Sequence, residues 1–149
     1  MWMALMWPVS SCLGQPATVR VVDVHDGRPL QKEKVSVAFL YEKGQKTLGE
    51  HQPNIHGETD ANGELQIQIP EPEPAHISVM VHVTSEYLLC GCWVLGDTKD
   101  LIQKGIVGPP PSTKWEKSDA AVKAAPGEVL VQARPMRFFE RLFYPIMKE

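Results

Sequence analysis

The amino-acid sequence predicts an all-β protein, a Greek-key β-sandwich of about seven strands. Apolar and polar side chains alternate over several short runs, and turn-forming residues separate these runs. The chain also contains 13 prolines and 11 glycines, which suit short strands joined by turns. Its 149 residues, 43% of them hydrophobic, suffice for one domain with one core.

The expected strands follow the alternation of apolar side chains. They are 18–24, 35–41, 46–49, 65–69, 77–83, 87–94 and 128–134. The segment 87–94 is apolar on both faces, so it is either a central strand or the start of an insertion. The fold prediction depends on one condition: two trios must point into one shared interior. These trios are Leu65, Ile67 and Ile69 in one strand and Ile77, Val79 and Val81 in the next.

Turn signals separate the strands. Asp26-Gly27 is expected to form a tight turn, and Asn62-Gly63 to adopt the left-handed backbone conformation. Asp60 is expected to accept hydrogen bonds from amides that follow it in the chain. The segment 51–58 contains Pro53 and Gly57 and has no period, so it is predicted to be a loop.

Two short helices are expected. One is an insertion near 98–104, with Asp97 or Thr98 as the N-cap and Gly105 as the stop. The other lies near 137–144, in a C-terminal amphipathic tail that spans 136–149. The tail either packs across an open end of the sandwich or docks on a membrane or partner.

The segment 1–16 resembles an export signal. Its first nine residues are apolar, too few to span a membrane, and small polar residues follow. No Lys or Arg precedes the apolar run, so the signal is either truncated or begins at a wrongly assigned start. A buried strand or an apolar tail is the alternative. Residues 9–12 also resemble a lipobox, which makes Cys12 a candidate for lipidation and membrane attachment.

Cys90 and Cys92 are separated by one glycine. Two small buried side chains explain this spacing, and a disulfide in an oxidising compartment is the alternative. Two thiols without a second pair are a weak metal signal.

The segment from Ala17 to near Val83 resembles the carboxypeptidase regulatory-like domain, a transthyretin-like or prealbumin-like β-sandwich. The resemblance is carried by Val19-Arg20-Val21-Val22-Asp23, Asp26-Gly27-Arg28-Pro29-Leu30, Val35-Ser36-Val37 and Thr59-Asp60-Ala61-Asn62-Gly63-Glu64-Leu65. The remainder resembles short exported bacterial proteins that carry this domain alone. The resemblance implies residues 17–135 as the sandwich, export, and an accessory or binding role. It brings no catalytic residues.

Reaction chemistry has little support in the sequence. No nucleophile elbow and no phosphate-binding glycine loop are present, so no enzyme activity, cofactor or metal is predicted. The densest potential ligand cluster is interpreted as a solvated polar loop; it consists of Glu50, His51, His56, Glu58 and Asp60. A net charge of −3 without a basic block argues against nucleic acid.

The predicted function is therefore recognition of an unknown protein or glycan partner by an exported module that is periplasmic, envelope-associated or secreted. Alternatives are a carbohydrate-binding module and a lipid-anchored envelope component. The candidate contact residues are aromatic; they are Trp93, Trp115, Phe138, Phe139 and Phe143.

Overall fold

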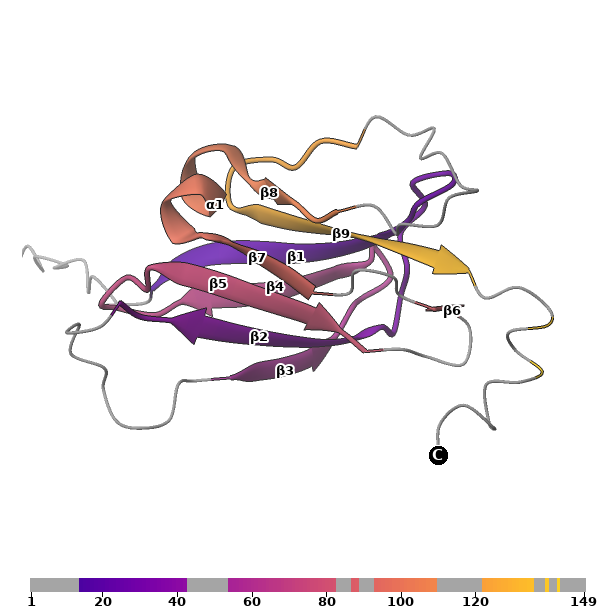
Figure 1. Ribbon diagram of the computed structural model, residues 1–149, viewed down its shortest axis with the longest axis horizontal. Helices are drawn as coiled ribbons and strands as arrows, with labels where there is room; N and C mark the ends of the chain where they lie inside the picture. Colours follow the sequence, from indigo (N-terminus) through magenta and orange to yellow (C-terminus); the bar gives the residue numbers. More distant parts are fainter. Residues whose placement is uncertain are drawn as a thin grey trace, which may run out of the picture.

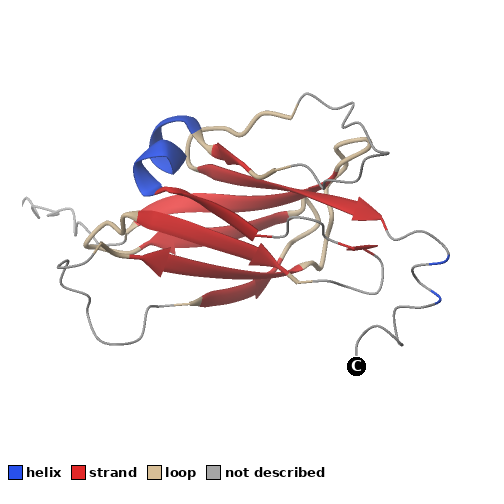
Figure 2. Ribbon diagram, in the orientation of Figure 1, coloured by secondary structure: helices blue, strands red, loops and turns tan. Residues whose placement is uncertain are grey.

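The computed structural model describes residues 14–42, 54–82, 87–88, 93–109 and 122–135, together with Phe139 and Leu142. The strands are β1 (Gln15–Asp23), β2 (Lys34–Leu40), β3 (Ile55–Glu58), β4 (Glu64–Ile69), β5 (His76–Val81), β6 (Tyr87–Leu88), β7 (Trp93–Asp97), β8 (Ile106–Val107) and β9 (Glu128–Pro135), and the helix is α1 (Thr98–Lys104). Strands dominate the described fold, and α1 lies beside one end of the sheets (Figures 1 and 2).

Two sheets form a sandwich. The five-stranded sheet has the order β4-β1-β9-β6, with β8 also paired to β9, and the four-stranded sheet has the order β3-β2-β5-β7. This architecture confirms the all-β sandwich that the sequence predicts. Its Greek-key connectivity stays a prediction.

The core lies between the two sheets, as the alternation predicts. Five of the six residues in the two trios are buried, and half-buried Leu65 packs against the same cluster. Buried Val35, Val37 and Phe39 of β2 alternate with outward-facing neighbours, because successive strand side chains point to opposite faces. Apolar burial of this kind contributes roughly 25 cal/mol per Å² and is the main force that holds the sheets together.

The chain brings β9 back to the middle of the five-stranded sheet. There β9 pairs parallel to β1, with Thr18 opposite Glu128 and Asp23 opposite Ala133. On its other side β1 pairs antiparallel to β4. The first and last long strands are therefore hydrogen-bonded neighbours, although more than 100 residues separate them in the sequence.

The helical insertion occurs where the sequence predicts it. Asp97 is the N-cap residue of α1, although its side chain makes no capping hydrogen bond. Gly105 ends the helix with a φ of 78°, and its N–H donates to the carbonyls of Asp100 and Leu101. Leu101 is fully buried and anchors the helix to the core.

The predicted turn before β4 is also confirmed. One carboxylate oxygen of Asp60 accepts hydrogen bonds from the N–H groups of Asn62 and Glu64, at 2.8 and 2.9 Å. Gly63 has a φ of +72°, and a Cβ there would lie 2.7 Å from the carbonyl oxygen of Val21. Only glycine satisfies both the backbone conformation and the close approach.

Two expectations were wrong. The segment 87–94 is not one central strand, because its first two residues form β6, at the edge of the five-stranded sheet, and its last two belong to β7, at the edge of the four-stranded sheet. The segment 51–58 was predicted to be a loop, but its last four residues form β3, which pairs antiparallel with β2. The alternation of apolar and polar residues did not reveal this strand, because Gly57 has no side chain at an inward-facing position. The glycine has a packing reason: a Cβ there would lie 2.6 Å from a Leu65 methyl group.

Other expectations lie outside the described residues. They include the strand 46–49, most of the export segment 1–16 and most of the helix near 137–144. β1 begins at Gln15, so its first two residues belong to the segment assigned to the signal. Within the described part of the chain, no helix has the length and hydropathy needed to cross a membrane.

Candidate recognition surface

The outward side of the four-stranded sheet carries an unusual set of side chains for a solvated surface. We call it the four-stranded face, and it comprises Lys34, Ser36, Ala38, His56, Glu58, Ser78, Met80, His82, Trp93 and Leu95. Period-two alternation places these residues outside, because their neighbours along each strand fill the core. The face combines large apolar groups with imidazoles and hydroxyls.

Trp93 is the largest exposed aromatic side chain on this face, with 58% of its surface accessible. Its Nε1–H donates a hydrogen bond to Ser78 Oγ on the neighbouring strand β5, which fixes the edge of the indole ring. Met80 pairs with Trp93 in the register, and Leu95 follows two residues later, and both are exposed. These three side chains form an apolar strip along one half of the face.

Ser36 binds two histidines on the other half of the face. Its Oγ lies 2.8 Å from His56 Nδ1 and 2.6 Å from His82 Nε2. We call these residues the Ser36 cluster. They come from β3, β2 and the residue after β5, which are adjacent in the sheet order. A hydroxyl has one proton, so when both rings are neutral one imidazole must donate an N–H while the other accepts.

Two shallow hollows flank the Ser36 cluster. The Glu58 hollow has a volume of about 360 Å³ and is lined by Lys34, Glu58 and the cluster. The Met80 hollow has a volume of about 250 Å³ and is lined by Ala38, Asn54, Ser78, Met80 and the cluster, among others. The cluster therefore stands between a charged hollow and a more apolar one.

A pair formed by one histidine and one aspartate lies at the other end of the same sheet. His76 Nδ1 is 2.6 Å from the Asp97 carboxylate, and both residues line a hollow of about 450 Å³. Glu42, Glu73 and Asp100 also line this hollow. His76 has an acidic partner, whereas the histidines of the Ser36 cluster are hydrogen-bonded to a hydroxyl and to no carboxylate in the described part of the chain.

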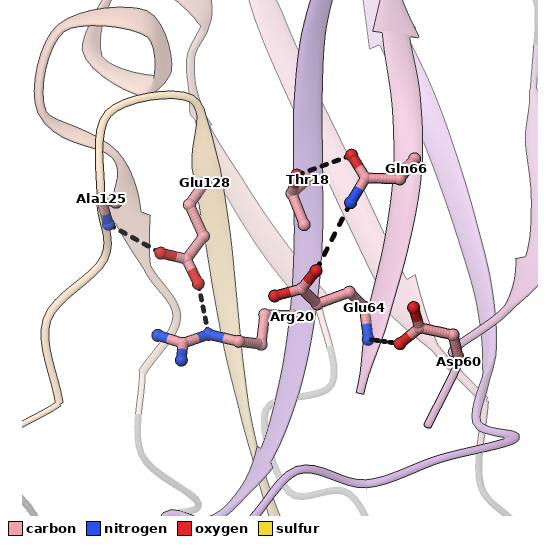
Figure 3. A network of polar contacts seen from close by, with 7 residues as sticks. All are labelled: Thr18, Arg20, Asp60, Glu64, Gln66, Ala125 and Glu128. Atoms are coloured by element: carbon pink, nitrogen blue, oxygen red, sulfur yellow. Dashed lines mark hydrogen bonds and ion pairs between the residues drawn. The ribbon is translucent and has the colours of Figure 1, made fainter. Parts of the chain in front are cut away.

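The outward side of the five-stranded sheet is organised differently (Figure 3). The Glu128 carboxylate forms an ion pair with Arg20 Nε, and it accepts a hydrogen bond from the N–H of Ala125 at 2.7 Å. Thr18 Oγ1 donates to Gln66 at 3.0 Å, and the Gln66 amide approaches Glu64 at 3.5 Å. These polar groups are hydrogen-bonded to one another across β4, β1 and β9, so we interpret them as structural.

The structure places the predicted contact residues unevenly. Trp93 lies exposed on the four-stranded face, and Phe139 is 70% exposed. The other predicted positions lie outside the described residues; they are Cys12, Cys90, Cys92, Trp115, Phe138 and Phe143. Among the residues that are described, no group of three or more His, Cys, Asp or Glu side chains is arranged to hold a metal.

Sequence reasoning missed the Ser36 cluster. The available signal was that Ser36 lies between two core valines and that His82 follows the core residue Val81, so both face outward. The missing information was the sheet order, which brings β3, β2 and the end of β5 together.

In comparisons with known proteins, no family model matches the chain, and no curated protein matches its sequence.

Proposed function

We propose that this chain is an exported, non-catalytic binding module of the carboxypeptidase regulatory-like type. It recognises a protein or glycan partner with the four-stranded face. The observation that carries the proposal is Trp93: a large aromatic side chain, 58% exposed, whose orientation is held by a hydrogen bond to Ser78. Oriented aromatic residues of this kind give contact area at low entropic cost and are enriched at binding sites.

The surroundings of Ser36 support a non-catalytic role. Acyl transfer by a serine requires a base that is held by a third group, and donors for an oxyanion. Among the described residues, neither His56 nor His82 is hydrogen-bonded to a carboxylate. The backbone of Ser36 lies in the middle of β2, where both neighbouring strands pair with it.

A glycan is the partner that the chemistry of the face favours. The flat side of an indole stacks on the apolar faces of sugars, and the Met80 hollow beside it offers hydroxyl, amide and imidazole groups. A carbohydrate-binding module is therefore the first alternative within this proposal.

A lipid-anchored envelope component is the second alternative. It would use a lipid at Cys12, the aromatic tail, or both. Phe139 and Leu142 are exposed, which supports association of the tail with a membrane or partner. Mass spectrometry of the mature N-terminus distinguishes an uncleaved chain, a cleaved chain and a chain acylated at Cys12. An intact Met1 in export-competent cells would contradict both targeting hypotheses.

A glycan array tests the recognition surface. Wild-type protein is expected to bind a subset of glycans, and Trp93→Ala is expected to lose at least ~30-fold in affinity, because an aromatic anchor contributes about 2 kcal/mol or more. Val107→Ala, which shortens an exposed apolar side chain on β8, is the matched control and should bind as wild type does. Equal binding by wild type and Trp93→Ala would contradict the assignment of the face.

A further inference from the structure

The Ser36 cluster has a property that surface recognition does not require. Two imidazole nitrogens, one from β3 and one from the residue after β5, converge on one oxygen atom, at 2.8 and 2.6 Å. The nitrogens are therefore separated by no more than the sum of these distances. Both histidines are exposed, and the backbone that carries them is fixed by pairing of β2 with β3 and β5.

We infer that His56 and His82 form a binding site for a late first-row divalent metal ion, namely Ni²⁺, Cu²⁺ or Zn²⁺. Neutral imidazole is a preferred ligand of these ions. Metal–nitrogen bonds of about 2.0–2.1 Å place two ligand nitrogens roughly 3–4 Å apart, which is within the upper bound that Ser36 sets, and rotation of two exposed side chains can bring the nitrogens to this separation.

The groups around the cluster suit a cation. Glu58 lies two residues from His56 on the same strand face and lines the same hollow. Its carboxylate adds negative charge to the hollow, which favours a cation, and the two imidazoles alone serve as protein ligands. Lys34, which pairs with Glu58 in the register, is the one Lys or Arg among the described residues that lines it. Water can fill the remaining coordination positions because the hollow is open to solvent.

The His76–Asp97 pair at the other end of the sheet is a weaker candidate. Its imidazole faces one carboxylate at 2.6 Å, and no second imidazole lines its hollow among the described residues. Because Ni²⁺, Cu²⁺ and Zn²⁺ prefer sites with several imidazole ligands, these ions are expected to bind at the Ser36 cluster rather than at His76. This inference does not depend on whether the face also recognises a macromolecule.

Calorimetric titration of the full chain with Ni²⁺ tests the site. Wild-type protein is expected to bind with a component that His56→Ala and His82→Ala each weaken ~10-fold or more, as loss of one ligand should. His76→Ala is the matched control, because it removes the half-buried histidine at the start of β5, the strand that ends just before His82, and its binding should stay within twofold of wild type. Far-UV circular dichroism verifies that each variant is folded.

A gain of affinity provides the second arm. Ser36→Asp places a carboxylate between the two imidazoles, so Ni²⁺ affinity is expected to rise at least ~3-fold. Unchanged affinity in His56→Ala and His82→Ala would overturn the inference. So would an equal loss in His76→Ala, or no gain in Ser36→Asp.

Discussion

The two outward faces of the sandwich use polar residues in opposite ways. On the five-stranded sheet, Glu128 is joined to Arg20 and to the Ala125 N–H, and the carboxylate is only 13% exposed. On the four-stranded face, Trp93 and Met80 are exposed. The Ser36 cluster there consists of one hydroxyl hydrogen-bonded to two imidazoles, without an ion pair among the described residues.

This contrast is consistent with the proposed function, in which contacts within the five-stranded sheet stabilise the molecule and the four-stranded face binds the partner. A charged group whose partners lie in the same sheet gains little from an external ligand, since binding would first break those contacts. The open face of the Trp93 ring has no such cost, and the imidazoles of the Ser36 cluster lose only hydrogen bonds to one hydroxyl rather than an ion pair. The four predictions that follow test this separation, from the largest expected effect to the smallest.

Phe39→Ala should destabilise the whole molecule, because both faces depend on one core. Phe39 is 1% exposed between the sheets, and truncation of a buried phenylalanine costs about 3–5 kcal/mol. Urea unfolding should show one cooperative transition at a lower midpoint. A loss below about 1 kcal/mol would mean that the sheets do not share this core.

Gly63→Ala should destabilise the turn that precedes β4. The residue has a φ of +72°, and the new Cβ would meet the Val21 carbonyl oxygen at 2.7 Å. The expected loss in unfolding free energy is ~1–3 kcal/mol. Gly27→Ala is the control: it shares the φ of +72° but has no atom within 4 Å of the added Cβ, so it should lose less. Equal losses would assign the effect to backbone strain alone.

These two glycines also show what the sequence could reveal about the fold. Turn chemistry and period two indicated the sandwich, the buried trios and the helix at 98–104, because these features depend on neighbours along the chain. The pairing of β1 with β9 and the strand β3 depend on contacts between distant segments. Gly57 shows the limit well: its reason is the distant Leu65 side chain.

The candidate site also has a part that the sequence indicated and a part that depends on contacts between distant segments. Trp93 was recognisable as an aromatic residue that could face solvent. His82 directly follows the core residue Val81 and is exposed. The convergence of His56 and His82 on Ser36 was not predictable, since it needs both the order of three strands and their register.

Glu128→Ala should remove part of the structural network on the five-stranded sheet. The variant loses an ion pair and one hydrogen bond, so the expected cost is ~1–2 kcal/mol. The difference from wild type should shrink in 1 M NaCl, because salt screens the partly exposed Arg20. Gln68→Ala, an exposed position on β4, should change stability by less than ~0.5 kcal/mol. If both variants behave alike, the network is not structural.

Ser36→Ala should have the smallest effect on stability. Its two hydrogen bonds join exposed side chains, so the free energy of unfolding should change by no more than ~0.5 kcal/mol. The measurement is the same urea titration. A loss as large as that of Glu128→Ala would place the Ser36 cluster among the structural networks and remove the contrast between the faces.

The most direct test of this separation is Ni²⁺-induced line broadening in a ¹⁵N–¹H correlation spectrum of the full chain. Substoichiometric Ni²⁺ should selectively broaden the amide signals of Ser36, His56 and His82, while those of Thr18, Glu64 and Glu128 stay sharp. Broadening centred on Glu64 and Glu128, or equal on both faces, would contradict the account.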